Sequence, residues 1–93
     1  MKTAWLKSFL AIEKYRSFSE AADSLFLSQS ALSKQLKALE EELNVQLFDR
    51  STHTIHLTQA GEKIISPAQR IIAEEERMLH DLSDLQTIHS NRL

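Results

Sequence analysis

Apolar residues recur at helical spacing through the last third of this chain, over a length that one small core cannot cover. They run from Ile64 to Leu85, inside a segment that the 3.6-residue period identifies as one helix over residues 59–90. At 1.5 Å per residue, such a helix is about 45 Å long, which is more than a globule of 93 residues covers. One glycine and one proline are too few for a turn-rich all-β fold. The sequence therefore predicts a mainly α-helical protein with a small head and a long projecting helix.

Two short helices are predicted at the start of the head. In residues 3–15 the apolar positions recur at spacings of four and three, which places them on one helix face. After a break, Ser19 is the candidate N-cap of a second helix over residues 19–25, because a serine hydroxyl accepts a hydrogen bond from a free backbone N–H. The small side chains of Ala21 and Ala22 in this helix favour the close approach of a neighbouring helix.

The third predicted helix has the clearest pattern. Ser28 is its candidate N-cap, and leucines then recur through Leu43 at spacings of four, three and four, which makes an inward-facing stripe. Asn44 follows at a place where helices often end in a left-handed residue, for which asparagine is the second choice after glycine. The opposite face is polar and holds two lysines and no acidic residue. This face is therefore the first candidate for a binding surface.

A short hairpin is predicted after this helix. Residues 45–48 and 55–57 read as two short strands on either side of a polar loop. Thr58 is then the candidate N-cap of the long helix, and Pro67 inside that helix predicts a kink or a loosened hydrogen bond. Two helices joined by a tight turn and followed by a hairpin form a winged helix-turn-helix, with residues 1–58 as the head.

The polar face of the third helix carries side chains suited to reading DNA. An α-helix fits the major groove of B-DNA, where glutamine pairs with adenine N6 and N7, serine contacts either base type, and lysine reaches guanine acceptors. Basic side chains farther along the helix and in the wing are placed for phosphates or the minor groove. The predicted DNA-binding residues are Ser28, Gln29, Ser30, Ser33, Lys34, Lys37, Arg50 and His53.

Several sequence blocks at fixed spacing point to one family. They are Phe18-Ser19-Glu20-Ala21-Ala22, Leu25, Leu27-Ser28-Gln29-Ser30-Ala31-Leu32-Ser33-Lys34-Gln35-Leu36, Leu39-Glu40, Leu43, Leu47-Phe48-Asp49-Arg50 and Leu57-Thr58-Gln59-Ala60-Gly61. From residue 3 to residue 90 the chain resembles the N-terminal DNA-binding domain and linker helix of the LysR-type transcriptional regulators. It differs from the usual family pattern at Ser30, where proline is common, and at Arg16 and Asn44, where glycine is frequent.

The resemblance implies a function and a set of partners. Members of the family bind double-stranded promoter DNA and activate or repress transcription in the cytoplasm. The positions of Gln29, Ser30, Ser33 and Lys34 then face the groove, and that of Arg50 meets the backbone or minor groove. The resemblance also implies a homodimer through the linker helix of residues 59–90. For a full-length regulator it implies a tetramer, contact with RNA polymerase and a C-terminal effector-binding domain, which is absent from these residues. No cofactor is expected.

The long helix carries more apolar surface than the head covers. Exposed apolar stripes of this size mark partner surfaces, so the sequence itself also predicts a dimer. The predicted dimer interface consists of Ile64, Ile65, Ala68, Ile71, Ile72, Leu79 and Leu82. Two-fold protein symmetry predicts an operator that is an interrupted inverted repeat.

Other classes of function have little support in the sequence. With no cysteine, thiolate zinc sites are excluded. His53 and His56 are three apart and would point to opposite faces of a strand, so no metal site is expected. The sequence contains neither a phosphate loop nor a nucleophile–histidine–acid arrangement that would suggest an enzyme. Its longest apolar run has four residues, which is too short for a membrane span. A winged helix that binds another protein remains the alternative, although the polar face lacks an aromatic or arginine anchor.

Overall fold

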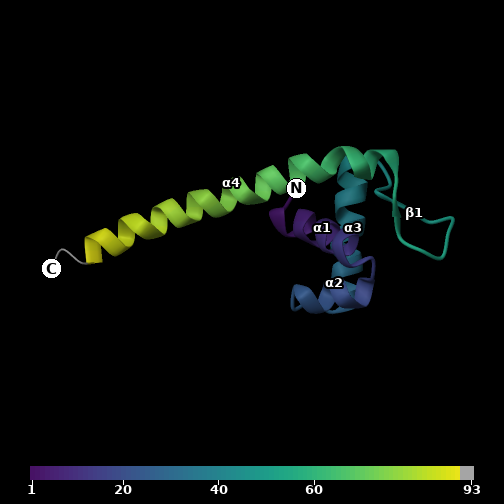
Figure 1. The fold of residues 1–93 in the computed structure, drawn as a ribbon, viewed down its shortest axis with the longest axis horizontal. Coiled ribbons are helices and arrows are strands. Elements are labelled where there is room, and N and C mark those ends of the chain that lie inside the picture. The colour runs from purple at the N-terminus through teal and green to yellow at the C-terminus, as the bar shows by residue number, and fades with distance from the viewer. Residues whose placement is uncertain (91–93) are drawn as a thin grey trace.

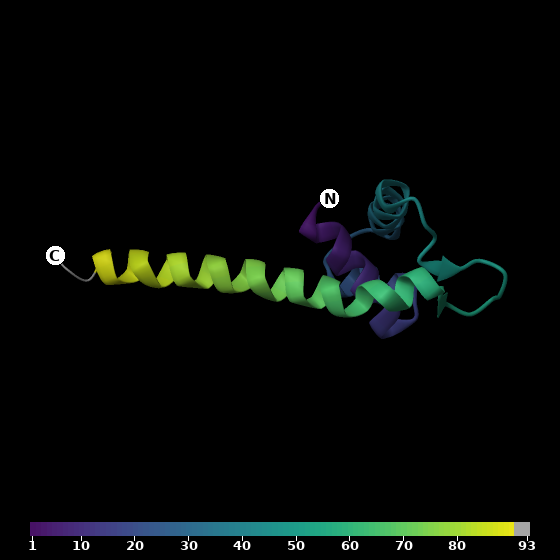
Figure 2. The same cartoon turned by 90° about the horizontal axis from the view of Figure 1, so that it is seen from above.

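The computed structural model describes the backbone of residues 1–90 and the side chains of residues 1–86. Within that part of the chain, three short helices and a small hairpin form a head, and one long helix projects from it (Figures 1 and 2). The mainly α winged helix-turn-helix architecture is therefore confirmed. The elements are α1 (Thr3–Tyr15), α2 (Phe18–Ser24), α3 (Gln29–Leu43), β1 (Phe48–Asp49), β2 (His56–Leu57) and α4 (Gln59–Ser90).

The corner between α1 and α2 consists of two residues with different backbone conformations. Arg16 ends α1 in the left-handed region, with φ 52° and ψ 36°, and its N–H donates to the Ile12 carbonyl. Ser17 is extended, and its hydroxyl accepts the N–H of Glu20 at 3.1 Å. The N-cap predicted at Ser19 is therefore wrong, because Ser19 lies in the first turn of α2 and Ser17 is the residue that caps it.

α3 begins and ends where the sequence predicts. The Ser28 hydroxyl accepts the N–H of Ala31 at 3.0 Å, which satisfies one free donor of the first turn. Asn44 ends the helix with φ 56°, and its N–H donates back to carbonyls of the last turn. Three of the four stripe leucines are fully buried, namely Leu32, Leu36 and Leu39. This buried stripe fixes the rotation of α3 and leaves its polar face outside.

The core of the head lies around α1, which packs against α2, α3 and α4. The rings of Phe9 and Phe48 lie 5.5 Å apart and join α1 to the hairpin. A polar link adds to this packing, because the Ser8 hydroxyl donates to the Gln35 side chain at 2.6 Å. The buried apolar residues are Leu6, Phe9, Ala11, Ile12, Ala21, Ala22, Leu32, Leu36, Leu39, Leu47, Phe48 and Ala68. α3 is thus held from behind by a continuous core.

The hairpin is shorter than predicted. Its antiparallel register pairs Phe48 with Leu57 and Asp49 with His56, and residues 45–47 are not part of the strand. The backbone groups of this segment have other partners. The Leu47 N–H donates to the Glu40 carboxylate, the Leu47 carbonyl accepts the Thr58 N–H, and the segment is therefore fastened to α3 and α4 instead of to β2.

α4 has one half packed on the head and one half free. Its N-cap is Thr58, as predicted, whose hydroxyl accepts the Gly61 N–H at 3.1 Å. Pro67 lies inside the helix without ending it. The first half packs on the core, the Thr3 hydroxyl donates to Glu75 at 2.7 Å, and the second half extends away from the head. Among the described residues, no helix is long and apolar enough to cross a membrane.

Candidate nucleic-acid interface

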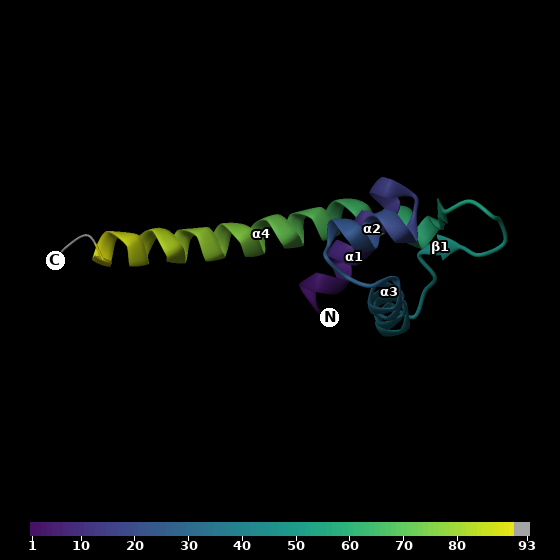
Figure 3. The ribbon, with the colours of Figure 1, turned by 90° about the horizontal axis from the view of Figure 1, so that it is seen from below.

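α3 lies at one edge of the head, with its polar face turned away from the other helices. Figure 3 shows α3 nearly end-on, with α1, α2 and α4 all on its other side. Every interface residue predicted on or beside this helix is exposed, which applies to Ser28, Gln29, Ser30, Ser33, Lys34 and Lys37. The structure therefore brings these six residues together on one accessible surface.

The charge of this surface is positive and unneutralised. Neither Lys34 nor Lys37 forms an ion pair with any residue whose side chain is described, whereas three arginines elsewhere in the described part of the chain do so. The nearest acid along α3 is Glu40, which is buried and points to the inside of the head. Both ammonium groups are therefore available to an anionic partner such as a phosphate.

Arg50 does more than the sequence predicts, since it also fastens the wing to α3. Its Nη2 donates to Oε1 of Glu40 at 2.8 Å, and the other oxygen of Glu40 accepts the Leu47 N–H at the same distance. About half of the Arg50 side chain, 51%, stays exposed. Because a guanidinium has five N–H donors, Arg50 keeps donors for a ligand while Glu40 fixes its position.

Replacing Glu40 with alanine should lower the free energy of unfolding by about 2 kcal/mol, because the buried Leu47 N–H loses a charged acceptor. Glu40→Gln keeps one acceptor oxygen for that N–H and should lose about half as much. Urea denaturation of both variants measures the difference. Glu41→Ala is the matched control, since Glu41 is exposed on the same turn. Equal losses for Glu40→Ala and Glu41→Ala would contradict the role given to the buried carboxylate.

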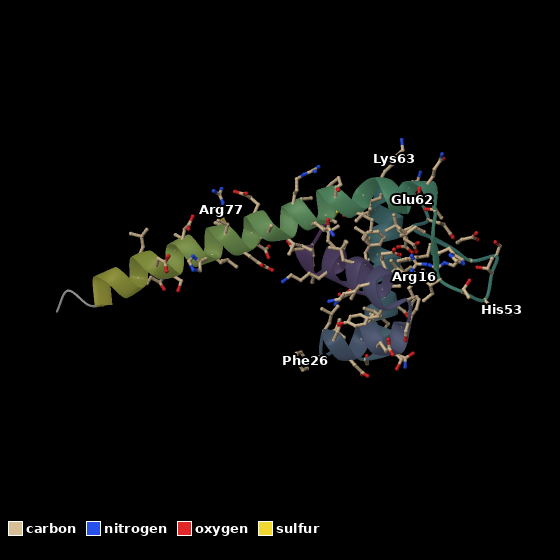
Figure 4. All side chains as sticks on the ribbon, viewed as in Figure 1. Arg16, Phe26, His53, Glu62, Lys63 and Arg77 are labelled. Atoms are coloured by element: carbon tan, nitrogen blue, oxygen red, sulfur yellow. The ribbon has the colours of Figure 1, made fainter. Side chains whose placement is uncertain are left out.

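The wing loop extends from the head and carries His53 at its outer end (Figure 4). His53 is exposed, as its predicted role requires. At the base of the loop, the Asp49 carboxylate accepts the Ser51 hydroxyl at 2.5 Å and the Ser51 N–H at 2.8 Å. These two hydrogen bonds, with a smaller contribution from the charge of His56, hold the pKa of Asp49 below its usual value. The wing therefore keeps one carboxylate ionised beside its histidines.

The predicted dimer residues on α4 fall into two groups. Ala68 is buried in the core of its own head, and Ile64, Ile65 and Ile72 are partly buried against that core. These four side chains therefore contribute to the packing of the head. α1 packs against α4 and covers this side of its first half, whereas the predicted residues Ile71, Leu79 and Leu82 stay exposed. The exposed large apolar residues of α4 are Ile71, which lies in the packed half and lines a hollow on the head, and Met78, Leu79, Leu82 and Leu85 in the free half. Met78 and Leu85 are absent from the predicted set, although the same helical period includes them.

The turn between α2 and α3 contains an aromatic residue that the sequence reasoning missed. Phe26 is 97% exposed and has a left-handed backbone, with φ 57°. Its neighbours Leu25 and Leu27 pack against the core, and no local pattern separates the three residues. Figure 4 shows Phe26 on the side of the head away from the wing.

Comparison with known proteins places this geometry in a family. The family described as "Bacterial regulatory helix-turn-helix protein, lysR family" matches residues 3–62. The regulator PtxR of Pseudomonas aeruginosa is 43% identical over 95% of this chain, and an HTH-type regulator of Azotobacter vinelandii is 41% identical over all of it. The chain spans 28% of the length of PtxR and 65% of the Azotobacter relative.

Two solved structures with DNA are similar in both fold and sequence. Vibrio fischeri DarR, a LysR-type activator solved in complex with DNA, superposes with a TM-score of 0.88 at 30% identity, over 95% of this chain and 30% of its own. The DNA-binding domain of BenM, solved with catB site 1 DNA, superposes with a TM-score of 0.84 at 30% identity, over 92% of this chain and 97% of its own. The chain therefore belongs to the LysR family of bacterial regulatory helix-turn-helix proteins.

Proposed function

We propose that this chain is the sequence-specific DNA-binding module of a transcriptional regulator. The observation that carries the proposal is the exposed face of α3, which presents two unpaired lysines and no exposed acid before Glu41. DarR and the BenM domain support it, because each was solved with DNA and each superposes on this whole arrangement. The module acts by binding, and we assign it no catalytic step.

α3 lies in the major groove, and its first turns read bases. Gln29 contacts adenine through a bidentate pair, while Ser33 and Lys34 contact the next base edges. Ser28 and Ser30 lie at the start of the helix, where hydroxyls and backbone N–H groups favour phosphate oxygens. Lys37 lies farther along the helix and neutralises a phosphate. Base reading is thus concentrated in the first two turns of α3.

The wing contacts DNA beside the bases that α3 reads. Arg50 donates from the half of its guanidinium that Glu40 does not use, and His53 approaches the backbone or minor groove from the loop tip. A fixed ion pair at the base of the wing reduces the number of conformations that Arg50 must lose on binding. The Glu40–Arg50 pair therefore orients the wing for its contact.

Two copies associate through the exposed apolar face of α4, which begins at Ile71 and continues along the free half. Ile71, Met78 and Leu85 are spaced by seven residues, and Leu82 lies on the same helix face, as in a two-helix seam. The exposed apolar side chains on this half support a homodimer. The two-fold axis of the dimer then matches an operator with two inverted half-sites.

For a full-length regulator containing this chain, the resemblance supports further partners. We propose residues 1–58 as the DNA-binding head and residues 59–90 as the linker between it and an effector-binding domain. Because the first half of α4 completes the core of the head, the two parts fold as one unit. Tetramer formation, contact with RNA polymerase and a cytoplasmic location are further proposals from the same resemblance.

Selection from a random duplex pool at moderate salt tests the proposal directly. Enrichment of a two-fold symmetric motif by a dimeric protein would support sequence-specific regulation and would give the operator. A folded dimer that enriches no motif and binds random DNA no better than polyphosphate would contradict it. That result would favour the alternative of a winged helix that binds another protein.

Gln29→Ala should weaken binding to the selected operator by about 1–3 kcal/mol and relax the preference at one base pair in each half-site.

Lys37→Ala should weaken operator and random DNA alike and flatten the dependence of affinity on salt. Fluorescence anisotropy with both duplexes at several salt concentrations separates these two effects. If Gln29→Ala lost the same affinity on operator and random DNA, Gln29 would not read a base. If Lys37→Ala lost affinity only on the operator, Lys37 would not be a phosphate contact.

A further inference from the structure

The corner between α1 and α2 faces the wing across a shallow hollow. Its lining residues are Arg16, His53, Thr54, Ile55 and His56. Figure 4 shows Arg16 between the body of the head and the wing, with His53 at the loop tip. We propose that this hollow binds a DNA phosphate that lies outside the bases read by α3, with Arg16 as its principal contact. The inference rests on the proposed DNA-binding function and extends it to a residue outside α3 and the wing.

The charge of the hollow favours an anion. None of its lining residues is acidic. Arg16 uses Nη2 to pair with Glu13 at 3.0 Å, which is on the α1 side, and 54% of its side chain is exposed. The nearest acid in the wing is Asp49, an ionised carboxylate that accepts both Ser51 hydrogen bonds and does not line the hollow. The remaining guanidinium donors of Arg16 are therefore the strongest anion ligands available at this place.

The arginine side chain at position 16 has no role in the packing of the head. Arg16 has φ 52°, in the left-handed region that glycine adopts without steric conflict and other residues adopt at a cost. Its exposed side chain packs into no part of the core, so the fold itself gains little from arginine here. The left-handed conformation is explained by the end of α1, so it is the exposed, unpacked arginine side chain that indicates a contact outside the fold.

The position of the hollow suits the path of a duplex. The wing lies on the side of the head opposite to the free half of α4 (Figures 1 and 3). A duplex with its major groove on α3 continues past the wing, and one of its strands then passes the gap between the wing and the α1–α2 corner. A phosphate on that strand meets Arg16 from one side and the polar wing residues from the other.

The test compares Arg16→Gly with the wild type on two duplexes, one with several base pairs beyond each half-site and one trimmed at the half-site ends. On the longer duplex, loss of one phosphate contact in each subunit should lower affinity about tenfold at 0.15 M salt and flatten the log–log salt slope by about 2. On the trimmed duplex the two proteins should bind equally. Glycine suits the left-handed backbone, so the thermal midpoint should be maintained.

Arg77→Ala is the matched control, because Arg77 pairs with Glu74 at the same i, i+3 spacing but lies on α4, far from the wing. It should bind both duplexes like the wild type, and Arg16→Lys should recover most of the lost salt slope. Equal binding by Arg16→Gly and wild type on the longer duplex would overturn the inference, as would an equal loss on both duplexes. Failure of the wild type to bind either duplex would instead overturn the proposed function.

Discussion

Replacing Ile71 with aspartate should convert the proposed dimer into monomers. Full burial of one isoleucine is worth about 1.5–3 kcal/mol, and the 42% of Ile71 that is exposed leaves somewhat under half of this for an interface that contains the residue twice. Losing both copies should raise the dimer dissociation constant by about one to two orders of magnitude, and the desolvation of two aspartate charges raises it further. Sedimentation equilibrium measures the mass, and operator affinity should fall together with it, because each half-site then binds alone.

Two further variants make this result specific. Leu82→Asp tests the same surface farther from the head, where the side chain is 53% exposed and does not line the head. Ala73→Asp places the same charge on an exposed residue about 200° around the helix from Ile71, and should leave the dimer intact. A dimer that persists in both Ile71→Asp and Leu82→Asp would exclude this face as the interface. Ile72 is a poor test site, because it packs against the core.

The helix boundaries could be predicted because they depend on local chemistry. Ser28 and Thr58 each precede an apolar period, and each hydroxyl accepts the N–H three residues later. The error at Ser19 was avoidable, since Ser17 and Glu20 have the serine-x-x-glutamate spacing of a capping box. Where two serines compete, that spacing is the better guide than proximity to the apolar residues.

The parts that could not be predicted depend on where distant segments meet. The pairing of Glu40 with Arg50 requires the wing to fold back on α3, and no period in the sequence encodes that contact. Ala68 and Leu82 have the same helical pattern, yet one lies in the core of the head and the other is exposed. Only the position of α1 along α4 separates them. The α3 face was predictable because its leucine stripe fixes its orientation locally.

Replacing Gly61 with alanine should lower the free energy of unfolding by about 2–3 kcal/mol, even though the same change inside most helices is stabilising. Gly61 is the only glycine in the chain, and its φ is not positive. A Cβ there would overlap the carbonyl oxygen of Leu47 and would lie 2.9 Å from a methyl of Leu57. Because the first of these is a backbone atom, the start of α4 must move away from the segment before β1.

The same clash gives the prediction a second readout. Leu47 accepts the Thr58 N–H at 3.0 Å and donates to Glu40, so its displacement disturbs both the N-cap of α4 and the base of the wing. Gly61→Ala should therefore also weaken the contact of Arg50 with the operator. The measurement is the operator affinity of the folded variant protein, which should be lower than that of the wild type. Ser66→Ala, at an exposed position on the same helix, should change neither property. If Gly61→Ala were as stable as the wild type, the close contact between Gly61 and Leu47 would not be needed for stability, and this prediction would be wrong.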